Sequence, residues 1–217
     1  MGFVLMSFVP VRMWAVLAAL LSVSLGNGVS TAFAQTALSG AKKDAKILVA
    51  YFSRADENYG VGVVEKGNTQ ILAEVIAKEL KADSFHIKTV SPYPKNYREC
   101  TNAASDEKKK NARPKLSGTV PNVKDYDIIF LGYPIWWGDL PMAVYTFLEG
   151  ADFSGKTIIP FCTHEGSGES GTAGRIQSAC PNAKVLKAFS MLGQTAQRSR
   201  DTAKLNTIKW LGEIKVN

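Results

Sequence analysis

The chain of 217 residues has little histidine and little cysteine, and both shortages restrict its chemistry. His86 and His164 are its two histidines, and no ligand cluster has the spacing of a zinc site, so no metal centre is expected. Cys100, Cys162 and Cys180 contain no Cys-x-x-Cys pair and allow at most one internal disulfide. A bridge between Cys162 and Cys180 fits an oxidising compartment, but Cys162 lies in an apolar run, where a buried free thiol is more common.

The N-terminal segment has almost no charge. Its first 34 residues carry only Arg12, which precedes an apolar run over residues 13–21. This run is shorter than the roughly 20 apolar residues that span a bilayer, and Ala32-Phe33-Ala34 has the small-x-small pattern that signal peptidase cleaves. We therefore predict a signal peptide over residues 1–34, cleaved after Ala34, rather than a retained anchor. Because neither a twin arginine nor a cysteine at the cleavage site is present, we expect a periplasmic or secreted protein without a stable membrane span after processing.

The remaining chain is basic and of ordinary globular composition. Its formal net charge is +7, which becomes +6 once the single positive charge of residues 1–34 is removed. The densest cationic cluster is Lys108-Lys109-Lys110 with Arg113. Such clusters are usually solvated helix faces, and export makes nucleic acid an improbable partner. We expect no nucleic-acid binding, although an anionic ligand or partner stays compatible with this charge.

Strand and helix patterns alternate along residues 46–217. We predict strands at residues 46–52, 85–90, 127–132, 156–162 and 184–189, and helices at 67–80, 96–112, 142–148, 174–179 and 199–213. In the last helix, Leu205, Ile208 and Leu211 are expected to face inward. The alternation favours one α/β domain at 46–217, with a mostly parallel sheet and helices on both faces, preceded by a linker at 35–45.

Three loops with unusual compositions follow predicted strands. Because ligands of such sheets bind at the carboxyl ends of the strands, we expect these loops to lie together: Ser53–Thr69, Tyr133–Pro141 and Thr163–Gly171. The first includes a polar stretch, Ala55–Lys66, that we interpret as an inserted surface loop. The second carries the adjacent Trp136 and Trp137. Two tryptophans between prolines and glycines suit a lid over a flat ligand, and the alternative is that both rings fill the core beside the sheet.

Three familiar motifs are misleading. Gly150–Thr157 fits the phosphate-loop pattern but follows a helix and opens a strand, the reverse of what nucleotide binding requires. Gly166–Gly171 fits G-x-G-x-x-G, but no acidic residue stands about 20 positions later to hold a ribose. His164 near Ser167 lacks the G-x-S-x-G elbow of a hydrolase. The glycine-rich loop is better explained as backbone placed against another ligand.

A phosphate site remains as a better-supported interpretation of the first loop. Ser53 ends the first strand, and Asn68 and Thr69 begin the first helix. Hydroxyls, an amide and a helix N-terminus together can hold a phosphate dianion. Arg54 can add a charge-assisted contact, while Asn68 also suits the simpler role of helix N-cap.

These motifs, in their order and spacing, resemble the flavodoxin family, in particular a bacterial flavodoxin-like branch. The resemblance covers roughly residues 46–190 and is carried by Ala50–Arg54, Gly67-Asn68-Thr69, Gly132–Gly138 and Phe161–Gly168. It implies a three-layer fold with a five-stranded parallel sheet of order 2-1-3-4-5, and FMN as cofactor. By this resemblance Ser53, Asn68 and Thr69 hold the phosphate, with Arg54 as a further candidate. One side of the isoalloxazine is flanked by Pro134, Ile135, Trp136, Trp137 and Gly138, and the other is closed by Thr163, His164, Gly166, Ser167 and Gly168.

The chain departs from the family pattern in two respects. The stretch Ala55–Lys66 interrupts a loop that is usually compact, and the basic charge differs from the acidic surface of flavodoxins that shuttle electrons. The familiar protein partners are therefore not implied, and the redox partner or small-molecule acceptor is left open.

The function implied is an FMN-binding redox protein outside the cytoplasm, active in electron transfer or in reduction of a quinone-like acceptor. A one-electron carrier and a two-electron NAD(P)H or quinone reductase both fit, with His164 or Tyr133 as candidate proton donors in the second case. The alternative from another class is a flavodoxin-like binding module that has lost FMN and binds another small anionic or aromatic ligand.

Overall fold

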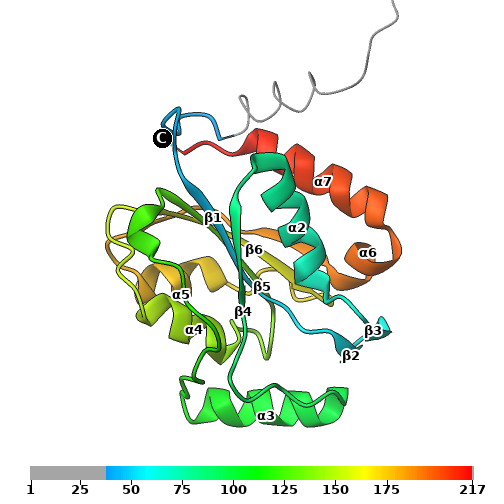
Figure 1. The fold of residues 1–217 in the computed structure, drawn as a ribbon. Helices are drawn as coiled ribbons and strands as arrows, with labels where there is room; N and C mark the ends of the chain where they lie inside the picture. Colours follow the sequence, from blue (N-terminus) through cyan, green and yellow to red (C-terminus); the bar gives the residue numbers. More distant parts are fainter. Residues whose placement is uncertain (1–37, 217) are drawn as a thin grey trace, which may run out of the picture.

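The computed structural model describes residues 38–216 (Figure 1). The predicted signal peptide, residues 1–34, and the first residues of the predicted linker lie outside this range. Residues 38–45 are described, and they pack against the C-terminal end of the chain. Leu38 is buried, and Val216 N donates to Ser39 O over 2.7 Å. Across residues 38–216, no helix is long and apolar enough to cross a bilayer.

One parallel sheet forms the centre of the molecule. Its order is β4-β1-β5-β6-β7, with β8 also paired to β6, and all of these pairs are parallel. The strands are β1 (Ile47–Phe52), β4 (Asp83–Ile87), β5 (Ile128–Pro134), β6 (Thr157–His164), β7 (Lys184–Val185) and β8 (Phe189–Leu192). Numbered along the sheet this is the order 2-1-3-4-5, so the predicted α/β architecture is confirmed.

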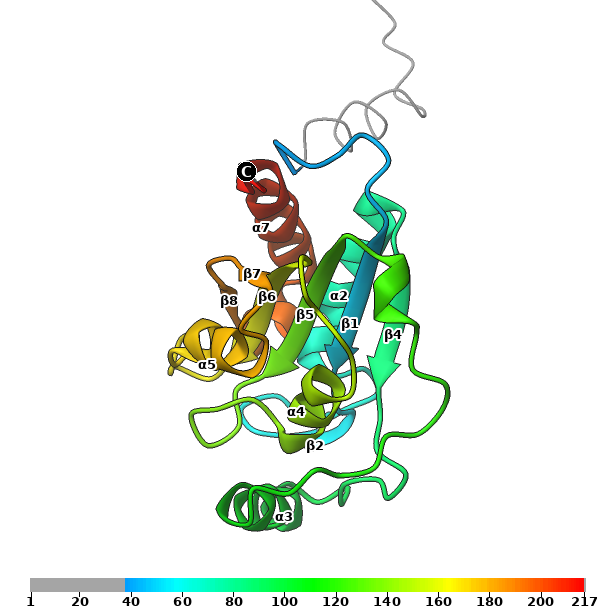
Figure 2. The ribbon, with the colours of Figure 1, turned by 90° about the vertical axis from the view of Figure 1, so that its left-hand side faces the viewer.

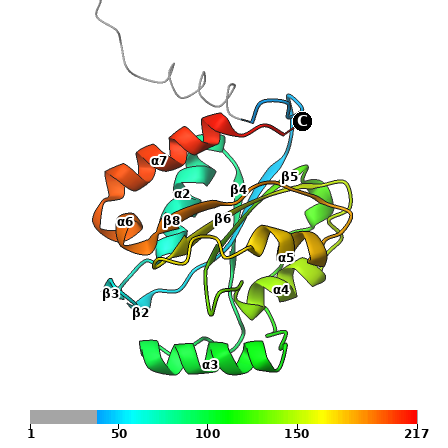
Figure 3. The same cartoon turned by 180° about the vertical axis from the view of Figure 1, so that it is seen from behind.

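Helices cover both faces of the sheet (Figures 1 and 3). On one face lie α2 (Asn68–Leu80), α6 (Gly193–Arg198) and α7 (Arg200–Glu213), and on the other α4 (Met142–Glu149) and α5 (Thr172–Ala179). Each face has its own apolar core, which explains why the central strands are continuous apolar runs rather than alternating ones. After β1 the chain forms β4 on one side of β1 and then β5 on the opposite side of β1. A crevice between β1 and β5 therefore opens at the carboxyl ends of the strands.

The edge of the sheet next to β6 differs from the single strand predicted at residues 184–189. Val185 pairs with Ile158 and Phe189 with Phe161, so the edge chain has one residue more than β6 between these pairs. The extra residue is a bulge, which divides the strand into β7 and β8.

Helix α7 corrects another expectation. Leu205 does not face inward, because the residue is 67% exposed. The buried residues of this helix are Ala203, Thr207 and Leu211, which are four residues apart and therefore share one face. Leu205 lies away from that face.

The inserted stretch Ala55–Lys66, predicted as a surface loop, contains a small antiparallel hairpin. Its strands are β2 (Asp56–Asn58) and β3 (Gly62–Val64). Asn58 Nδ2 donates to three carbonyls at the base of the hairpin, those of Arg54, Ala55 and Asp56. The hairpin has few apolar residues and no clear sequence period, so these polar contacts, rather than a core, define it.

Helix α3 (Tyr97–Lys109) lies beyond the carboxyl ends of the strands instead of covering a face of the sheet (Figures 1 and 2). Asn96 caps it by accepting a hydrogen bond from Glu99 N over 3.1 Å. The short 3-10 helix η1 (Val123–Asp125) then leads into β5. Because α3 and the β2–β3 hairpin both lie at this end, they border the crevice in which a ligand is expected.

Candidate cofactor-binding site

A cavity of about 300 Å³ opens at the carboxyl ends of β1, β5 and β6. The three loops predicted to meet do meet here. The cavity is lined by Arg54, Asn58, Tyr59, Asn68, Tyr97, Cys100, Thr101, Ala104, Pro134, Ile135, Trp136, Trp137, Thr163, His164 and Glu165. Its size and its aromatic walls with a few polar groups are those of a small-molecule site.

The tryptophan loop is a tight reversal of the chain. Trp136 N donates to Asp139 O over 2.9 Å, and Asp139 N donates to Trp136 O over 3.0 Å. The two residues between them have positive φ, 51° at Trp137 and 69° at Gly138. Positive φ at both central positions is the geometry of a type I′ turn. Trp137 is thus held in a left-handed conformation that a bulky residue adopts only when its surroundings impose it.

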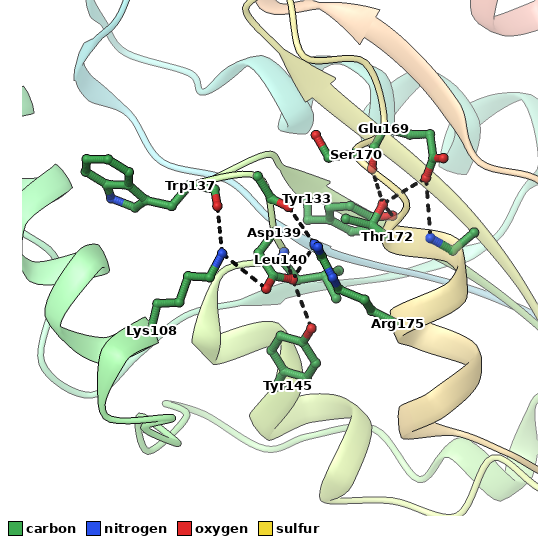
Figure 4. A network of polar contacts seen from close by, with 12 residues as sticks. Lys108, Tyr133, Trp137, Asp139, Leu140, Tyr145, Glu169, Ser170, Thr172 and Arg175 are labelled. Atoms are coloured by element: carbon green, nitrogen blue, oxygen red, sulfur yellow. Dashed lines mark hydrogen bonds and ion pairs between the residues drawn. The ribbon is translucent and has the colours of Figure 1, made fainter.

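Those surroundings form a charged network centred on Asp139 (Figure 4). Lys108 reaches from α3 and donates to Trp137 O over 2.7 Å, with its Nζ 3.5 Å from Asp139 Oδ2. Arg175 reaches from α5 and donates to Gly138 O, with its Nη1 3.1 Å from Asp139 Oδ1. Tyr145 of α4 donates to Asp139 Oδ1 over 2.9 Å. Three helices therefore fix both carbonyls of the turn and the carboxylate that follows it.

The two tryptophans have different environments. The Trp136 ring makes edge contacts with Phe52 and Tyr93, with ring centroids 5.2 Å and 5.0 Å away. Trp137 is 58% exposed, and its Nε1 donates to Thr101 O over 2.9 Å. Both rings line the cavity. Trp136 thus packs against core aromatic rings at the inner side of the cavity, and Trp137 forms its outer wall, so the two rings do not both fill the core.

The predicted phosphate residues divide into one that lines the cavity and two that support it. Asn68 lines the cavity. Ser53 Oγ accepts from Gln70 N over 3.0 Å, and Thr69 Oγ1 lies 2.8 Å from Thr163 Oγ1 in a buried contact. Asn68 is not the N-cap of α2, because that position is Gly67, which supplies no side-chain cap. The first turn of α2 holds no acidic residue, so its N-terminus remains suited to an anion.

Arg54 lines the cavity, but its guanidinium is committed to main-chain carbonyls. It donates to Pro94 O, to Lys95 O and, over 2.6 Å, to Glu57 O. These bonds use four of its five N–H groups. Arg54 thus ties the hairpin to the chain entering α3, and the expected charge-assisted phosphate contact is not its main role.

The loop after β6 contributes its first residues to the cavity. Thr163 and His164 line it, whereas Gly166, Ser167 and Gly168, like Gly138 of the turn, do not. His164 Nδ1 accepts from Gly166 N over 3.0 Å, which places the proton of the neutral ring on Nε2. Burial lowers the pKa of His164, so the neutral ring is favoured.

Tyr133 is not placed to act as a proton donor. Its side chain is completely buried, does not line the cavity, and its hydroxyl lies 2.8 Å from Thr172 Oγ1 (Figure 4). Burial raises its pKa far above the ordinary tyrosine value. This finding corrects one of the two candidates for proton transfer and leaves His164.

Tyr133→Phe is therefore expected to lower stability without changing the chemistry of the site. Loss of one buried hydroxyl contact costs about 1 kcal/mol of unfolding free energy. Urea unfolding measures this change, and ligand affinity of the variant should match that of the wild type. A loss of ligand affinity with unchanged stability would contradict the structural role.

Six lining residues were missed by sequence reasoning, and Glu165 lies in the loop Thr163–Gly171 that was expected at the site. The six come from the hairpin (Asn58, Tyr59) and from α3 (Tyr97, Cys100, Thr101, Ala104). The α3 residues are spaced i, i+3, i+4 and i+7, which is the signature of one helix face. That pattern was visible, but it did not indicate that the face covers a ligand site.

The three cysteines are free and buried, so Cys162 and Cys180 form no disulfide.

The lining residues fit the cofactor that the flavodoxin resemblance implies. Within residues 38–216, two buried side-chain oxygens lack a hydrogen-bond partner, Asn68 Oδ1 and Glu165 Oε1, and both residues line the cavity. Unpaired buried acceptors indicate a place for a ligand with donor groups. The aromatic walls suit a planar ring, and the first turn of α2 suits a phosphate. Over the same range, no group of three or more His, Cys, Asp or Glu residues is arranged to hold a metal ion.

Comparisons with known proteins agree with this geometry. Two solved structures, from Bacteroides eggerthii DSM 20697 and Bacteroides uniformis ATCC 8492, are provisionally assigned as flavoproteins. They are 28% and 29% identical to the chain, with TM-scores of 0.56 and 0.59; each alignment covers 74% of this chain, and 98% and 96% of theirs. A flavoprotein of Lactobacillus acidophilus NCFM, solved with FMN, shares the fold at 17% identity, with a TM-score of 0.54 over 72% of this chain and 99% of its own.

No functionally curated protein matches the chain. A family model described as flavodoxin matches residues 46–208, which is most of the domain predicted from the sequence. This match supports FMN as the cofactor. The family match agrees with the parallel sheet of order 2-1-3-4-5 and with the cavity at the crevice between β1 and β5. We conclude that the chain belongs to the flavodoxin family.

Proposed function

We propose that the chain is an FMN-dependent oxidoreductase that acts outside the cytoplasm and reduces a small, quinone-like acceptor. Family membership and the lining of the cavity support the cofactor. The location rests on the predicted signal peptide at residues 1–34. The acceptor class rests on an aromatic pair at the border of the cavity.

That pair is Tyr59 of the hairpin region and Tyr97 of α3. Both line the cavity, their ring centroids are 5.9 Å apart, and the two residues are 61% and 36% exposed. Large exposed aromatic rings that do not pack into a hydrophobic core are typical of recognition surfaces. The helix α3 and the hairpin lie at the end of the sheet that holds the cavity. A small acceptor molecule that enters between them therefore suits the site better than an acceptor protein that docks with a broad surface.

The residues of the cavity have separable roles in this proposal. Bound FMN supplies the transfer of one or two electrons. Trp136 and Trp137 orient its ring and exclude water, and the first turn of α2 binds its phosphate. Reduction of a quinone to a hydroquinone consumes two electrons and two protons, which come from the flavin, after an external electron donor has reduced it, and from solvent. His164, neutral and protonated at Nε2, is the lining residue suited to donate a hydrogen bond to a quinone oxygen.

The mature chain, residues 35–217, is expected to bind FMN at micromolar concentrations or below. Binding should shift the visible absorption of the flavin and quench its fluorescence, because the ring enters an aromatic environment. A titration of the apoprotein with FMN measures both signals. A flavin spectrum identical to that of free FMN would contradict the cofactor assignment and favour a binding module that has lost FMN.

A second measurement tests the acceptor. The chemically reduced holoprotein, mixed with a soluble benzoquinone, should be reoxidised at a rate that rises with quinone concentration and then saturates. Tyr59→Ser should raise the half-saturating concentration. Tight FMN binding with no saturable reaction would contradict the reductase assignment and favour electron exchange with a protein partner.

A further inference from the structure

The inserted hairpin beside the cavity has no apolar core of its own. It lies between α6 and the start of α3 (Figures 1 and 3). No residue of Ala55–Lys66 is buried, so burial of apolar side chains does little to hold the hairpin in place. Its position therefore depends on the hydrogen bonds that it makes with these two neighbours.

The first strand of the hairpin is bound to the chain that enters α3. Glu57 N donates to Lys95 O over 3.2 Å. Glu57 Oε2 accepts from Tyr97 N over 2.8 Å and from Asn96 Nδ2 over 3.0 Å. Arg54 adds its bonds to carbonyls of the same segment. The base of the hairpin is thus held by several main-chain and charge-assisted bonds at once.

The tip of the hairpin is bound to α6 by an exposed side chain. Arg198 Nη2 donates to Gly60 O over 2.7 Å, and its Nη1 donates to Gln194 Oε1 over 3.3 Å. Gly60 has a φ of 73°, and a Cβ added there would lie 2.9 Å from Gln194 Nε2 and 3.3 Å from Glu165 Oε2. The tip therefore fits closely against α6 and Glu165, and Arg198 supplies the hydrogen bond that joins them.

Helix α6 is itself fixed to the wall of the cavity. It begins at Gly193, where an added Cβ would overlap with Asn68 Nδ2 and with Glu165 Oε1. The bare backbone of Gly193 thus packs directly against two residues that line the cavity. Arg198 at the end of α6 therefore connects a fixed part of the site to the tip of the hairpin.

The tip carries Tyr59, the residue before Gly60, to the border of the cavity. The Tyr59 ring is largely exposed and lies beside the ring of Tyr97. Because no core holds Tyr59, its position follows that of the tip. We propose that Arg198 is a positioning residue for acceptor binding: by holding Gly60 it keeps the Tyr59 ring at the entrance and so limits the size of the acceptor that enters. This inference rests on the proposed reduction of a quinone-like acceptor.

Reoxidation of the reduced holoprotein by two acceptors of different size tests this role. The acceptors are a one-ring benzoquinone and a two-ring naphthoquinone sulfonate. Arg198→Gln removes the bond to Gly60 O, so the half-saturating concentration of benzoquinone should rise about threefold to tenfold, the equivalent of one lost hydrogen bond. The rate at saturation should stay within about twofold of the wild type, because the flavin is not touched. The efficiency with the naphthoquinone, relative to benzoquinone, should rise at least about threefold.

Matched variants separate position from charge and from backbone strain. Arg198→Lys keeps a cationic donor at the same position and should recover most of the wild-type selectivity. Lys204→Gln removes an equal charge from an exposed position on α7 and should leave the selectivity unchanged. Gly60→Ala displaces the tip without altering Arg198 and should reproduce the effect of Arg198→Gln. Gly62→Ala should not, because Gly62 has a similar positive φ but nothing lies within 4 Å of an added Cβ.

Two measurements need no turnover. Amide hydrogen exchange of the FMN-bound protein reports how firmly the hairpin is held. Arg198→Gln should raise the exchange rate of peptides that cover residues 57–66 at least about threefold, while peptides of α3 stay near the wild-type rate because the base of the hairpin remains bound. Fluorescence titration should show an FMN affinity within about twofold of the wild type.

The outcomes that overturn this inference differ from those that overturn the proposed function. If the wild type shows no saturable reaction with either quinone, both fail together. If the wild type reacts but Arg198→Gln keeps the wild-type selectivity or the wild-type exchange rate of the hairpin, this inference alone fails. A loss of FMN affinity as large as the loss for benzoquinone would place the hairpin at the cofactor instead of the acceptor. Equal effects of Arg198→Gln and Lys204→Gln would assign the change to charge.

Discussion

Trp136→Ala is expected to lower both the stability of the protein and its affinity for FMN, whereas Trp137→Ala lowers the affinity alone. The difference follows from what each ring contacts. The Trp136 ring is in edge contact with Phe52 at the end of β1 and with Tyr93. Its removal leaves a gap between the core and the cavity. We expect a loss of about 2–4 kcal/mol in unfolding free energy, near the lower end for a large buried aromatic residue because this ring is only partly buried.

Trp137 contributes little to the fold by comparison. The residue is 58% exposed, and the hydrogen bond from its Nε1 to Thr101 O is replaceable by water. We expect Trp137→Ala to change the unfolding free energy by less than about 1 kcal/mol. An aromatic stack contributes about 0.5–1.5 kcal/mol beyond buried area, so FMN affinity should fall about threefold to tenfold.

Chemical unfolding of both apoproteins and fluorescence titration with FMN measure these effects separately. A Trp137→Phe variant is the control, because it keeps an aromatic ring and should recover most of the affinity. If both alanine variants destabilise the protein equally, the division into a supporting ring and an outer wall is wrong. If neither alters FMN affinity, the tryptophan turn does not contact the cofactor.

Gly67→Ala is expected to weaken FMN binding at least about tenfold and to cost about 1–3 kcal/mol of stability. Gly67 has φ −67°, so alanine meets no conformational barrier there. Its Cβ, however, would lie 2.3 Å from Arg54 O and 2.3 Å from Ser53 Oγ. The main-chain oxygen cannot move aside without shifting the loop that leads into α2. The bond between Ser53 Oγ and Gln70 N, which orients this helix start, would break with it.

Gly174→Ala is the matched control for this prediction. Gly174 lies in α5, and nothing lies within 4 Å of a Cβ added there. Alanine should raise stability by about 0.5–1 kcal/mol and leave FMN affinity unchanged. Lumiflavin, which has no phosphate, should bind Gly67→Ala nearly as well as the wild type. An equal loss for FMN and lumiflavin would mean that the substitution disturbs the ring site rather than the phosphate site.

Local patterns determined which loops meet but not what each residue in them contacts. The Trp136-Trp137 pair was predicted to be either core or a lid over a ligand, and the two rings have different surroundings, with Trp136 against core aromatic rings and Trp137 exposed at the cavity. The sequence could not assign them, because the assignment depends on a turn with two positive φ values held by Lys108 and Arg175 from distant helices. Arg54 was expected at a phosphate for its charge and position. It instead binds carbonyls of a segment 40 residues away, a partner that no local pattern identifies.

By itself the sequence determined an α/β domain with a mostly parallel sheet, the boundaries of the strands to within a few residues and the end of the sheet at which the site lies. These features depend on short-range hydrophobic periodicity and on general rules for parallel sheets, whereas the strand order 2-1-3-4-5 was implied by the resemblance to the flavodoxin family. The tertiary structure decided how that end is enclosed. Segments far apart in the chain form three parts of this enclosure. They are the face of α3 that lines the cavity, the hairpin beside it, and the junction of Asn68, Glu165 and Gly193. Such contacts are set by packing and by long-range hydrogen bonds, which leave no periodic signal in the sequence.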